Sequence, residues 1–291
     1  MDKINKELSI IIPSRGRPEL LLKMMESVLD FAALPELIEF VIYLDNDESS
    51  DYEMFNSRAI IVKGERVHMG KMFSSCIEKA NGRTIIICND DVLVKTNNWD
   101  DIIYKNLKLF TDDVFLMYPN DLNKGEKLCT FPIFSKELFL KFPGVLPADL
   151  TLIDLHLQDL FFQLKGLGMN RIKFLHNVIF EHLHYTLGKS NFDETYSKRH
   201  RFENDDLFIL YADLRFKLSS EIFQLISNDV SSKKFLSSKF MEPKMTSVRY
   251  LKESLLMFWF NRAPLFYRFK LLLYMIARRI YNIFIYRFKS S

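Results

Sequence analysis

Cysteine is scarce in this chain, with three residues in 291, and no two of them form a Cys-x-x-Cys pair. Cys76, Cys88 and Cys129 are widely spaced and odd in number, which argues against a disulfide framework and against a zinc site. We expect them to be small core residues of a protein in a reducing compartment. The opening residues are polar and the apolar run after them is short, so we expect no secretory signal and a cytoplasmic location.

The chain also lacks an apolar run of the roughly 20 residues that a membrane-spanning helix needs. The longest uninterrupted apolar run near the C-terminus is Leu271 to Ala277, and the pair Arg278-Arg279 ends it. Residues 245–291 contain nine Lys or Arg and one Glu, a charge of +8, which leaves −5 for the rest of a chain whose total is +3.

This charge pattern predicts that residues 245–291 form a basic amphipathic helical tail lying on the anionic inner face of a membrane. The alternative is a helical hairpin packed on the main domain or on a second copy, as in a homo-oligomer. Nucleic acid is not an expected partner, because the body of the chain is acidic and no recognition motif appears.

Short apolar runs rich in β-branched residues alternate with helical periodicity in the first part of the chain. The expected helices are Glu19–Phe31, Gly70–Ala80 and Trp99–Phe110. The expected strands are Leu8–Ile12, Phe40–Leu44, Ala59–Val62, Thr84–Cys88, Val114–Tyr118, Ile172–Leu175 and Val178–Phe180. This alternation predicts an α/β fold with a mostly parallel central sheet, flanking helices and a C-terminal helical extension. We divide the chain into a domain of residues 1–228, a Ser/Lys-rich linker at 229–244 and the tail at 245–291.

Carboxylates follow two of the expected strands. Asp45 and Asp47 end one strand, and Asn89-Asp90-Asp91 ends another. Open α/β sheets bind ligands outside the carboxyl ends of their strands, and carboxylates there can hold a hard divalent cation that in turn binds a diphosphate. The alternative is that these aspartates only form turns and cap the next helix.

Two further segments carry groups that suit a charged ligand. Ser14, Arg15 and Arg17 lie at a helix N-terminus marked by Pro18, which favours an anion site, although the arginines could also be solvated loop residues. Gly70-Lys71 opens the next helix and is a weaker candidate of the same kind. His182 and His184 are two residues apart on an extended segment and so face the same side. Imidazole beside a carboxylate suits Mn²⁺, and the alternative is packing at a strand end.

The order of these segments is distinctive: IIPSRGRPE, LDND, HMGKMFSSCIEKANG and NDD, with Trp99-Asp100 after them. From Leu8 to Tyr196 the sequence resembles family 2-type glycosyltransferases with the A fold, in the nucleotide-diphospho-sugar transferase superfamily. The resemblance implies a Rossmann-like catalytic domain that moves a sugar from a UDP- or GDP-linked donor to a glycan or lipid-linked acceptor in surface polysaccharide synthesis, with Mn²⁺ or Mg²⁺.

The resemblance also implies roles for individual residues. Asp91 would be the direct metal ligand, helped by His182 or His184, which precede Gly188-Lys189 and Asp193-Glu194-Thr195-Tyr196. Asn89 stands where the family's Asp-x-Asp motif begins with Asp. The nucleotide and donor site would be formed by Pro13, Ser14, Arg15, Arg17, Asp45, Asp47, Lys71, Asn89 and Asp90.

The catalytic base is harder to place. An inverting transfer needs a carboxylate that takes the proton from the acceptor hydroxyl. His156-Leu157 stands where the family has a Glu-Asp pair, so Asp154 is our first candidate and Asp159 the second, with Asp149 a distant third; each could instead cap or solvate a helix. Two other functions stay open: a nucleotidyltransferase, which would normally show a Gly-rich phosphate loop, and a catalytically inactive scaffold of the same fold.

Overall fold

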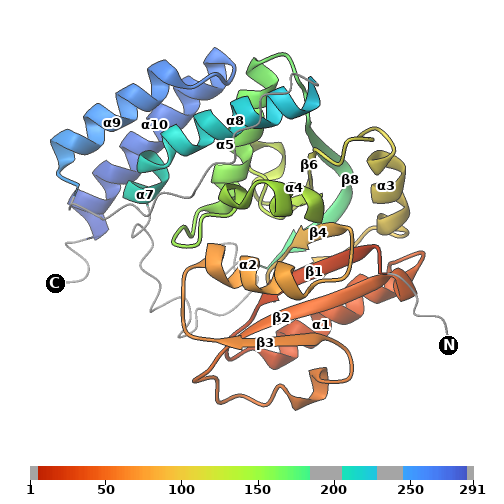
Figure 1. The fold of residues 1–291 in the computed structure, drawn as a ribbon. Coiled ribbons are helices and arrows are strands. Elements are labelled where there is room, and N and C mark those ends of the chain that lie inside the picture. The colour runs from red at the N-terminus through yellow and green to blue at the C-terminus, as the bar shows by residue number, and fades with distance from the viewer. Residues whose placement is uncertain (1–5, 184–204, 228–244, 287–291) are drawn as a thin grey trace. The chain divides into compact units, whose positions relative to one another are not determined.

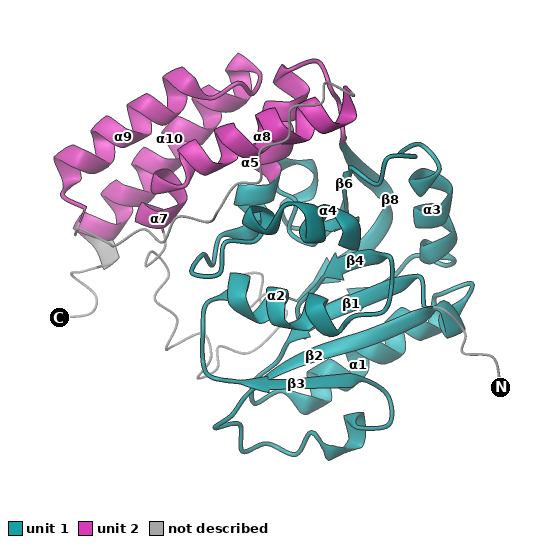
Figure 2. Cartoon of the chain, viewed as in Figure 1, with its two compact units in different colours: residues 1–157, 172–199 teal, residues 158–171, 200–291 magenta. Residues whose placement is uncertain are grey.

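The structure is a computed structural model that describes residues 6–183, 205–227 and 245–286. The chain forms two compact units: residues 1–157 with 172–199 make unit 1, and residues 158–171 with 200–291 make unit 2 (Figure 2). Within the described ranges, no helix has the length and apolar character needed to cross a membrane.

Unit 1 is built on an eight-stranded sheet with the order β3-β2-β1-β4-β7-β6-β8-β5 (Figure 1). Strands β3, β2, β1 and β4 are parallel; β7 runs antiparallel to β4 and β6, and β5 runs antiparallel to β8. The predicted α/β sheet is therefore confirmed, and its parallel part carries the ends of β1, β2 and β4 at one edge. The strands are β1 Leu8–Pro13, β2 Ile38–Asp45, β3 Ile60–Gly64, β4 Thr84–Ile87, β5 Val92–Val94, β6 Leu116–Asn120, β7 Ile133–Ser135 and β8 Ile172–His182.

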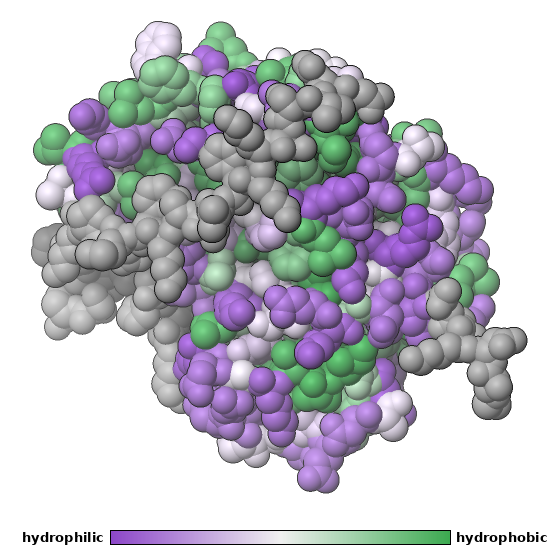
Figure 3. Space-filling view, in the orientation of Figure 1, coloured by the Kyte–Doolittle hydropathy of each residue, from purple (hydrophilic) through white to green (hydrophobic). Residues whose placement is uncertain are grey.

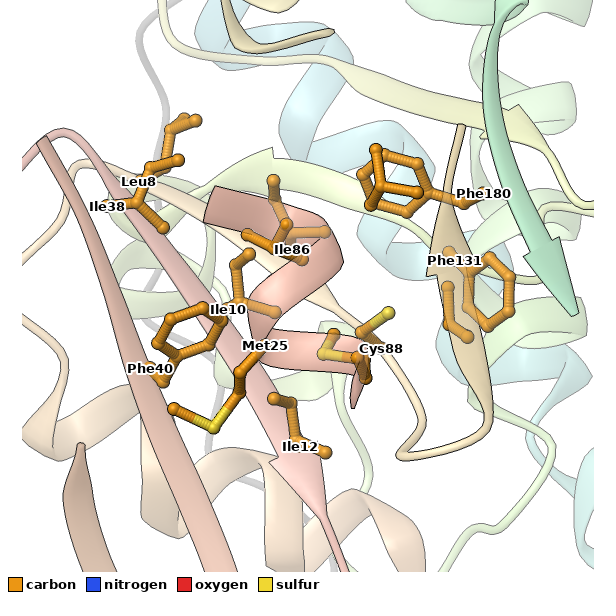
Figure 4. Close-up of a cluster of buried hydrophobic side chains, with 14 of the residues drawn as sticks. Leu8, Ile10, Ile12, Met25, Ile38, Phe40, Ile86, Cys88, Phe131 and Phe180 are labelled. Atoms are coloured by element: carbon orange, nitrogen blue, oxygen red, sulfur yellow. The ribbon is translucent and has the colours of Figure 1, made fainter. Parts of the chain in front are cut away.

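The core of unit 1 explains why these runs are strands. All eight residues of β2 are buried, as expected for a central strand covered on both faces. Helix α1 (Pro18–Asp30) has Pro at its start and buries an apolar face against the sheet, where Met25 lies beside Ile10 and Phe40 (Figure 4). Helix α2 (Met69–Lys79) covers the opposite face (Figure 1).

The remaining helices of unit 1 are short. They are α3 Trp99–Leu107, α4 Lys136–Lys141, the start of α5 Ile153–Gly166, and the 3-10 turns Pro35–Leu37, Glu53–Phe55, Gly125–Lys127 and Pro143–Val145. The three cysteines are free and buried, which confirms their prediction as core residues.

Unit 2 is helical and is organised around a buried ion pair. Arg215 Nε lies 2.6 Å from Asp159 Oδ2, and both side chains are fully buried. Asn261 donates to the other oxygen of Asp159 at 2.8 Å, so the carboxylate is bonded on both sides. The elements of this unit are the rest of α5, α7 Asp205–Leu210, α8 Ala212–Ile226, α9 Ser247–Phe260, α10 Leu265–Tyr281 and a π-helical turn, Asn282–Tyr286. The predicted linker, residues 229–244, lies outside the described residues.

Candidate functional site

The loops after β1, β2 and β4 meet at the carboxyl edge of the parallel strands. Residues 14–17 follow β1, residues 46–48 follow β2, and Asn89 to Asp91 follow β4. Since parallel neighbours end at the same edge, side chains far apart in sequence come within hydrogen-bonding distance here.

A relay of hydrogen bonds joins two of these segments, 14–17 and 89–91, to Tyr52, which lies between β2 and β3. Ser14 Oγ donates to Asp90 Oδ2 at 2.8 Å and lies 2.8 Å from the Tyr52 hydroxyl. Because the Ser14 hydroxyl has one proton, the Tyr52 hydroxyl donates to Ser14 while accepting the Arg17 amide at 3.1 Å. Arg17 Nη1 also lies 3.3 Å from Asp90 Oδ1. The relay fixes the loop after β1 to the strand end that carries Asp90.

Asp90 is 6% exposed, and its ionisation is unusual. Burial raises the pKa of Asp90 to about 6, against the lowering effect of Arg17 and together with the charge of Asp91. One oxygen of Asp90 accepts from Ser14 and the other from Arg17, so Asp90 positions the loop that follows β1.

A second cluster links the ends of β1 and β2. Arg15 Nη1 lies 2.7 Å from Asp45 and 2.6 Å from Asp47, and Nη2 lies 3.0 Å from the other oxygen of Asp47. The bond to Arg15 lowers the pKa of Asp47, and the same bond raises the pKa of Arg15. The positive charge of the Arg15 guanidinium thus offsets the repulsion between the carboxylates of Asp45 and Asp47 at the end of β2.

The backbone amide of Gly16 donates to the Glu48 carboxylate at 2.8 Å. Gly16 has φ +66°, a conformation that glycine adopts without strain. The Glu48 carboxylate therefore accepts a hydrogen bond from one of the backbone amides of the predicted anion site at the start of α1.

A pocket of about 450 Å³ opens beside Asp45. Asp45 is 5% exposed, and its Oδ1 has no hydrogen-bond partner among the described residues, so a buried acceptor is left for a ligand to use. The pocket is lined by Leu44, Asp45, Asn46, Glu48, Ser49, Ser50, Asp51, Tyr52, Glu53, Asn56, Ile61 and Lys63.

Asp91 and His182 form the third cluster. Asp91 Oδ1 lies 3.2 Å from His182 Nε2, and the two side chains are 3% and 8% exposed. The pairing of β5 with β8 sets Val92 opposite His182, and the Leu183 amide donates to the Asp91 carbonyl at 2.8 Å. The backbone therefore holds the carboxylate and the imidazole together.

The separation of this pair suits two ligands of one ion. Neighbouring ligands of an octahedral ion with bonds of about 2.1 Å lie about 3 Å apart, and an oxygen with an imidazole nitrogen suits Mn²⁺. Within residues 6–183, 205–227 and 245–286, no cluster of three or more His, Cys, Asp or Glu could hold a metal. The predicted His184 lies outside the described residues, as do Gly188-Lys189 and Asp193 to Tyr196. Asp91 and His182 would therefore supply two of the ligands of a divalent ion, and the remaining ligands would come from outside the described residues.

Three other predicted residues lie near this edge without a comparable network. Pro13 ends β1, Asn89 is half-buried, and the Lys71 side chain is exposed. The amides of Gly70 and Lys71 donate to the carbonyls of Leu150 and Ala148 at 2.9 and 3.0 Å, so those two helix-start amides are not open to an anion.

Gly70 also packs closely against the segment before α5. A Cβ atom at Gly70 would collide with the Pro147 carbonyl oxygen. Helix α2 and the segment 147–150 are therefore in direct backbone contact.

The two candidate bases have different surroundings. Asp154 lies in the first turn of α5 and is half-buried; its Oδ1 accepts the Leu155 amide at 2.7 Å. Asp159 belongs to unit 2 and is fully enclosed by Arg215, Gln163 and Asn261. The third candidate, Asp149, is half-buried.

Sequence reasoning missed Tyr52, Glu48 and Asp121. Asp121 is 1% exposed; its Oδ1 accepts the amides of Asn123, Lys124 and Gly125, and its carbonyl accepts the His182 amide at 3.1 Å. The Asp followed by Gly four residues later was a usable turn signal for Asp121. Nothing local marks the roles of Tyr52 and Glu48 at this site, since Ser14 and Gly16, which they bond here, are more than 30 residues away.

No family model matches the chain, and no curated protein matches it. Solved structures do. S. aureus TarS 1-349 in complex with UDP-GlcNAc is 13% identical, with a TM-score of 0.48 over 95% of this chain and 89% of that one. Glucosyl-3-phosphoglycerate synthase from Mycobacterium tuberculosis, in complex with Mn²⁺, UDP and phosphoglyceric acid, is 15% identical, with a TM-score of 0.45 over 63% of this chain and 74% of that one. At such low identity, the role of each side chain depends on the geometry of this chain.

Proposed function

We propose that this chain is a glycosyltransferase that moves a sugar from a nucleoside diphosphate donor to an acceptor hydroxyl. The observation that carries the proposal is the buried Asp91–His182 pair, held at 3.2 Å and one residue along the chain from the Ser14–Arg17–Asp90 network. The diphosphate of a sugar nucleotide carries several negative charges, so its binding needs a cation and fixed hydrogen-bond donors at one place. This edge of the sheet supplies residues for both.

The pocket beside Asp45 receives the nucleoside of a UDP- or GDP-linked donor. The Asp45 oxygen that lacks a partner among the described residues accepts a hydrogen bond from a ring N–H of the base. The apolar walls at Leu44 and Ile61 accommodate the face of the base, and Lys63 adds positive charge.

Asp91 and His182 hold a divalent ion, Mn²⁺ or Mg²⁺. Such an ion, when bound, neutralises charge on the departing diphosphate as a Lewis acid. Arg17, whose side chain is 10% exposed, adds a fixed positive charge beside Asp90. The low exposure of the site excludes water and so strengthens these interactions.

Asp154 is the proposed base of an inverting transfer. Its carboxylate is half-buried at the start of α5, whereas that of Asp159 is enclosed by an ion pair and has no exposed surface. Asp154 takes the proton from the acceptor hydroxyl as that oxygen attacks the anomeric carbon. The acceptor class we propose is a glycan or a lipid-linked glycan of a surface polysaccharide, met at the inner face of a membrane in the cytoplasm.

Release of UDP or GDP from a panel of nucleotide sugars, with Mn²⁺ present, tests this function. We expect turnover with at least one donor and a loss of at least about 100-fold in Asp91→Asn. Asp30→Asn, an exposed aspartate on α1, is the matched control and should keep full activity. Nucleotide binding without any turnover would favour the inactive scaffold, and release of pyrophosphate from nucleoside triphosphates would favour a nucleotidyltransferase.

A further inference from the structure

Helix α9 turns an apolar stripe outward. Its exposed positions include Val248, Leu251, Leu255 and Trp259, which are three or four residues apart, with Val248 81% and Trp259 70% exposed. Such spacing places them on one side of the helix. The opposite side, with Tyr250, Ser254 and Met257, is buried, and apolar side chains are visible at the surface over α9 (Figure 3).

Helix α10 repeats the pattern. It buries Leu271, Leu272 and Met275 and exposes Phe269, at 52%, and Leu273, at 51%. The Tyr250 hydroxyl donates to the Met275 carbonyl at 3.1 Å, which ties the two helices into a hairpin.

The turn of this hairpin carries four large apolar side chains that are exposed. Trp259, Phe260, Leu265 and Phe266 flank the turn and are 65–71% exposed. We call these four residues the hairpin tip. Large apolar groups gathered in this way mark an interaction surface.

The charge of the hairpin selects the partner. Arg278 and Arg279 are paired with Asp205 and Asp206, but five other Lys and Arg residues accompany a single acid, Glu253, between 247 and 277. Lys252 and Lys270 are on the exposed side, and Lys270 Nζ lies 4.3 Å from the Phe266 ring centroid. A second copy packed on this face would bring like charges together, whereas an anionic lipid surface complements both the lysines and the aromatic rings.

We propose that the hairpin tip inserts into the interfacial layer of an anionic lipid bilayer, with Lys252 and Lys270 at the level of the headgroups. Trp and Phe favour this layer, and the helices lie along the surface. The inference rests on unit 2 alone and does not depend on the transferase proposal, because vesicle binding is measured without a nucleotide sugar.

The fluorescence of Trp259 can report insertion of the hairpin tip into a bilayer. The chain has two tryptophans: Trp99 is fully buried and bonded to the Val28 carbonyl, and Trp259 is in the tip. Phosphatidylcholine vesicles containing phosphatidylglycerol should shift the emission of the full chain to the blue, and bromine-labelled lipid chains should quench it. Trp259→Phe should abolish the spectral change while keeping vesicle binding. Vesicles of phosphatidylcholine alone should bind at least about tenfold more weakly.

The double variant Trp259→Ser with Phe266→Ser should lose at least about tenfold in co-sedimentation with anionic vesicles. The matched control, Leu109→Ser with Leu140→Ser, removes apolar residues of comparable exposure (60% and 56%) from unit 1 and should bind as the parent does. Circular dichroism establishes that each variant is folded. Undiminished binding by a folded tip variant would overturn the proposal. So would a dimer in sedimentation without lipid in which Trp259 is shielded from an aqueous quencher, because a second copy would then cover the tip.

Discussion

Asp91 Oδ1 and His182 Nε2 lie 3.2 Å apart, although 90 residues separate them in the chain. They are brought together by the antiparallel pairing of β5 with β8, which sets Val92 opposite His182. A site held by the backbone in this way is preorganised. Removing either side chain should therefore lower the affinity for the ion more than it lowers the free energy of unfolding.

The first prediction concerns that ion. His182→Ala should weaken Mn²⁺ binding by at least about tenfold, because it removes the nitrogen donor and leaves Asp91 alone. Calorimetry of Mn²⁺ with UDP present measures this directly, and His176→Ala, an exposed histidine on the same strand, is the control. EDTA should abolish transfer and Mn²⁺ restore it. Full activity in EDTA would contradict the metal assignment.

The second prediction follows from Asp90, whose pKa is raised to about 6 by burial. An unfolded aspartate titrates near 4, so the native state binds the proton more tightly. The contribution to stability is complete below pH 4 and is lost as the pH rises through 6, by about 2–3 kcal/mol. Relative to Asp90→Asn, which cannot titrate, the parent should lose that amount between pH 4 and pH 7 in urea unfolding with EDTA. A constant difference across this range would show that Asp90 is not the titrating group.

Glu39 titrates in the opposite direction. Burial favours a higher pKa, but the bonds from Asn81, Ser9 and Gly82 outweigh it and lower the pKa of Glu39 below its usual value. Its stabilisation is present above the unfolded value, near 4.3, and is lost as the pH falls through the lower folded value. Glu39→Gln turns an acceptor into a donor facing these amides and should cost about 1–3 kcal/mol at pH 7. Urea unfolding checks this, and the exposed Glu36→Gln should change little.

The fourth prediction separates the two candidate bases. Asp159→Asn breaks a fully buried ion pair with Arg215 and should lower the free energy of unfolding by about 3–5 kcal/mol. Asp154→Asn should leave the melting temperature nearly unchanged and lower kcat by at least about 100-fold, with the acidic limb of the pH profile altered. A stable Asp159 variant with low kcat would reverse the assignment.

The strands were predictable because their signal is local. The run of three isoleucines and Cys88 predicts a strand over Thr84–Cys88, and the structure has it at Thr84–Ile87. The regions 172–175 and 178–180 were expected as two strands but form the single strand β8, whose pairing with β6 shifts register after Pro119. An irregular register depends on the neighbouring strand, and the periodicity of one segment does not report it.

The site could be predicted in part for the same reason. Strand ends mark Asp45, Asp90 and Asp91, since each follows an apolar run. The link from Arg15 to Asp45 and Asp47 and the relay through Tyr52 depend on which loops the fold brings together. Loop residues carry no periodic pattern, so their partners become visible only in three dimensions.

The close packing of Gly70 couples the position of α2 to that of the segment before α5. Because the start of α2 presses against the Pro147 carbonyl with no side chain between them, displacing that helix also displaces the segment that leads to Asp154. Replacing Gly70 with alanine should therefore displace the segment 147–150 and, with it, the proposed base Asp154. Gly70 thus allows two segments of unit 1 to pack backbone against backbone, which a larger side chain would prevent.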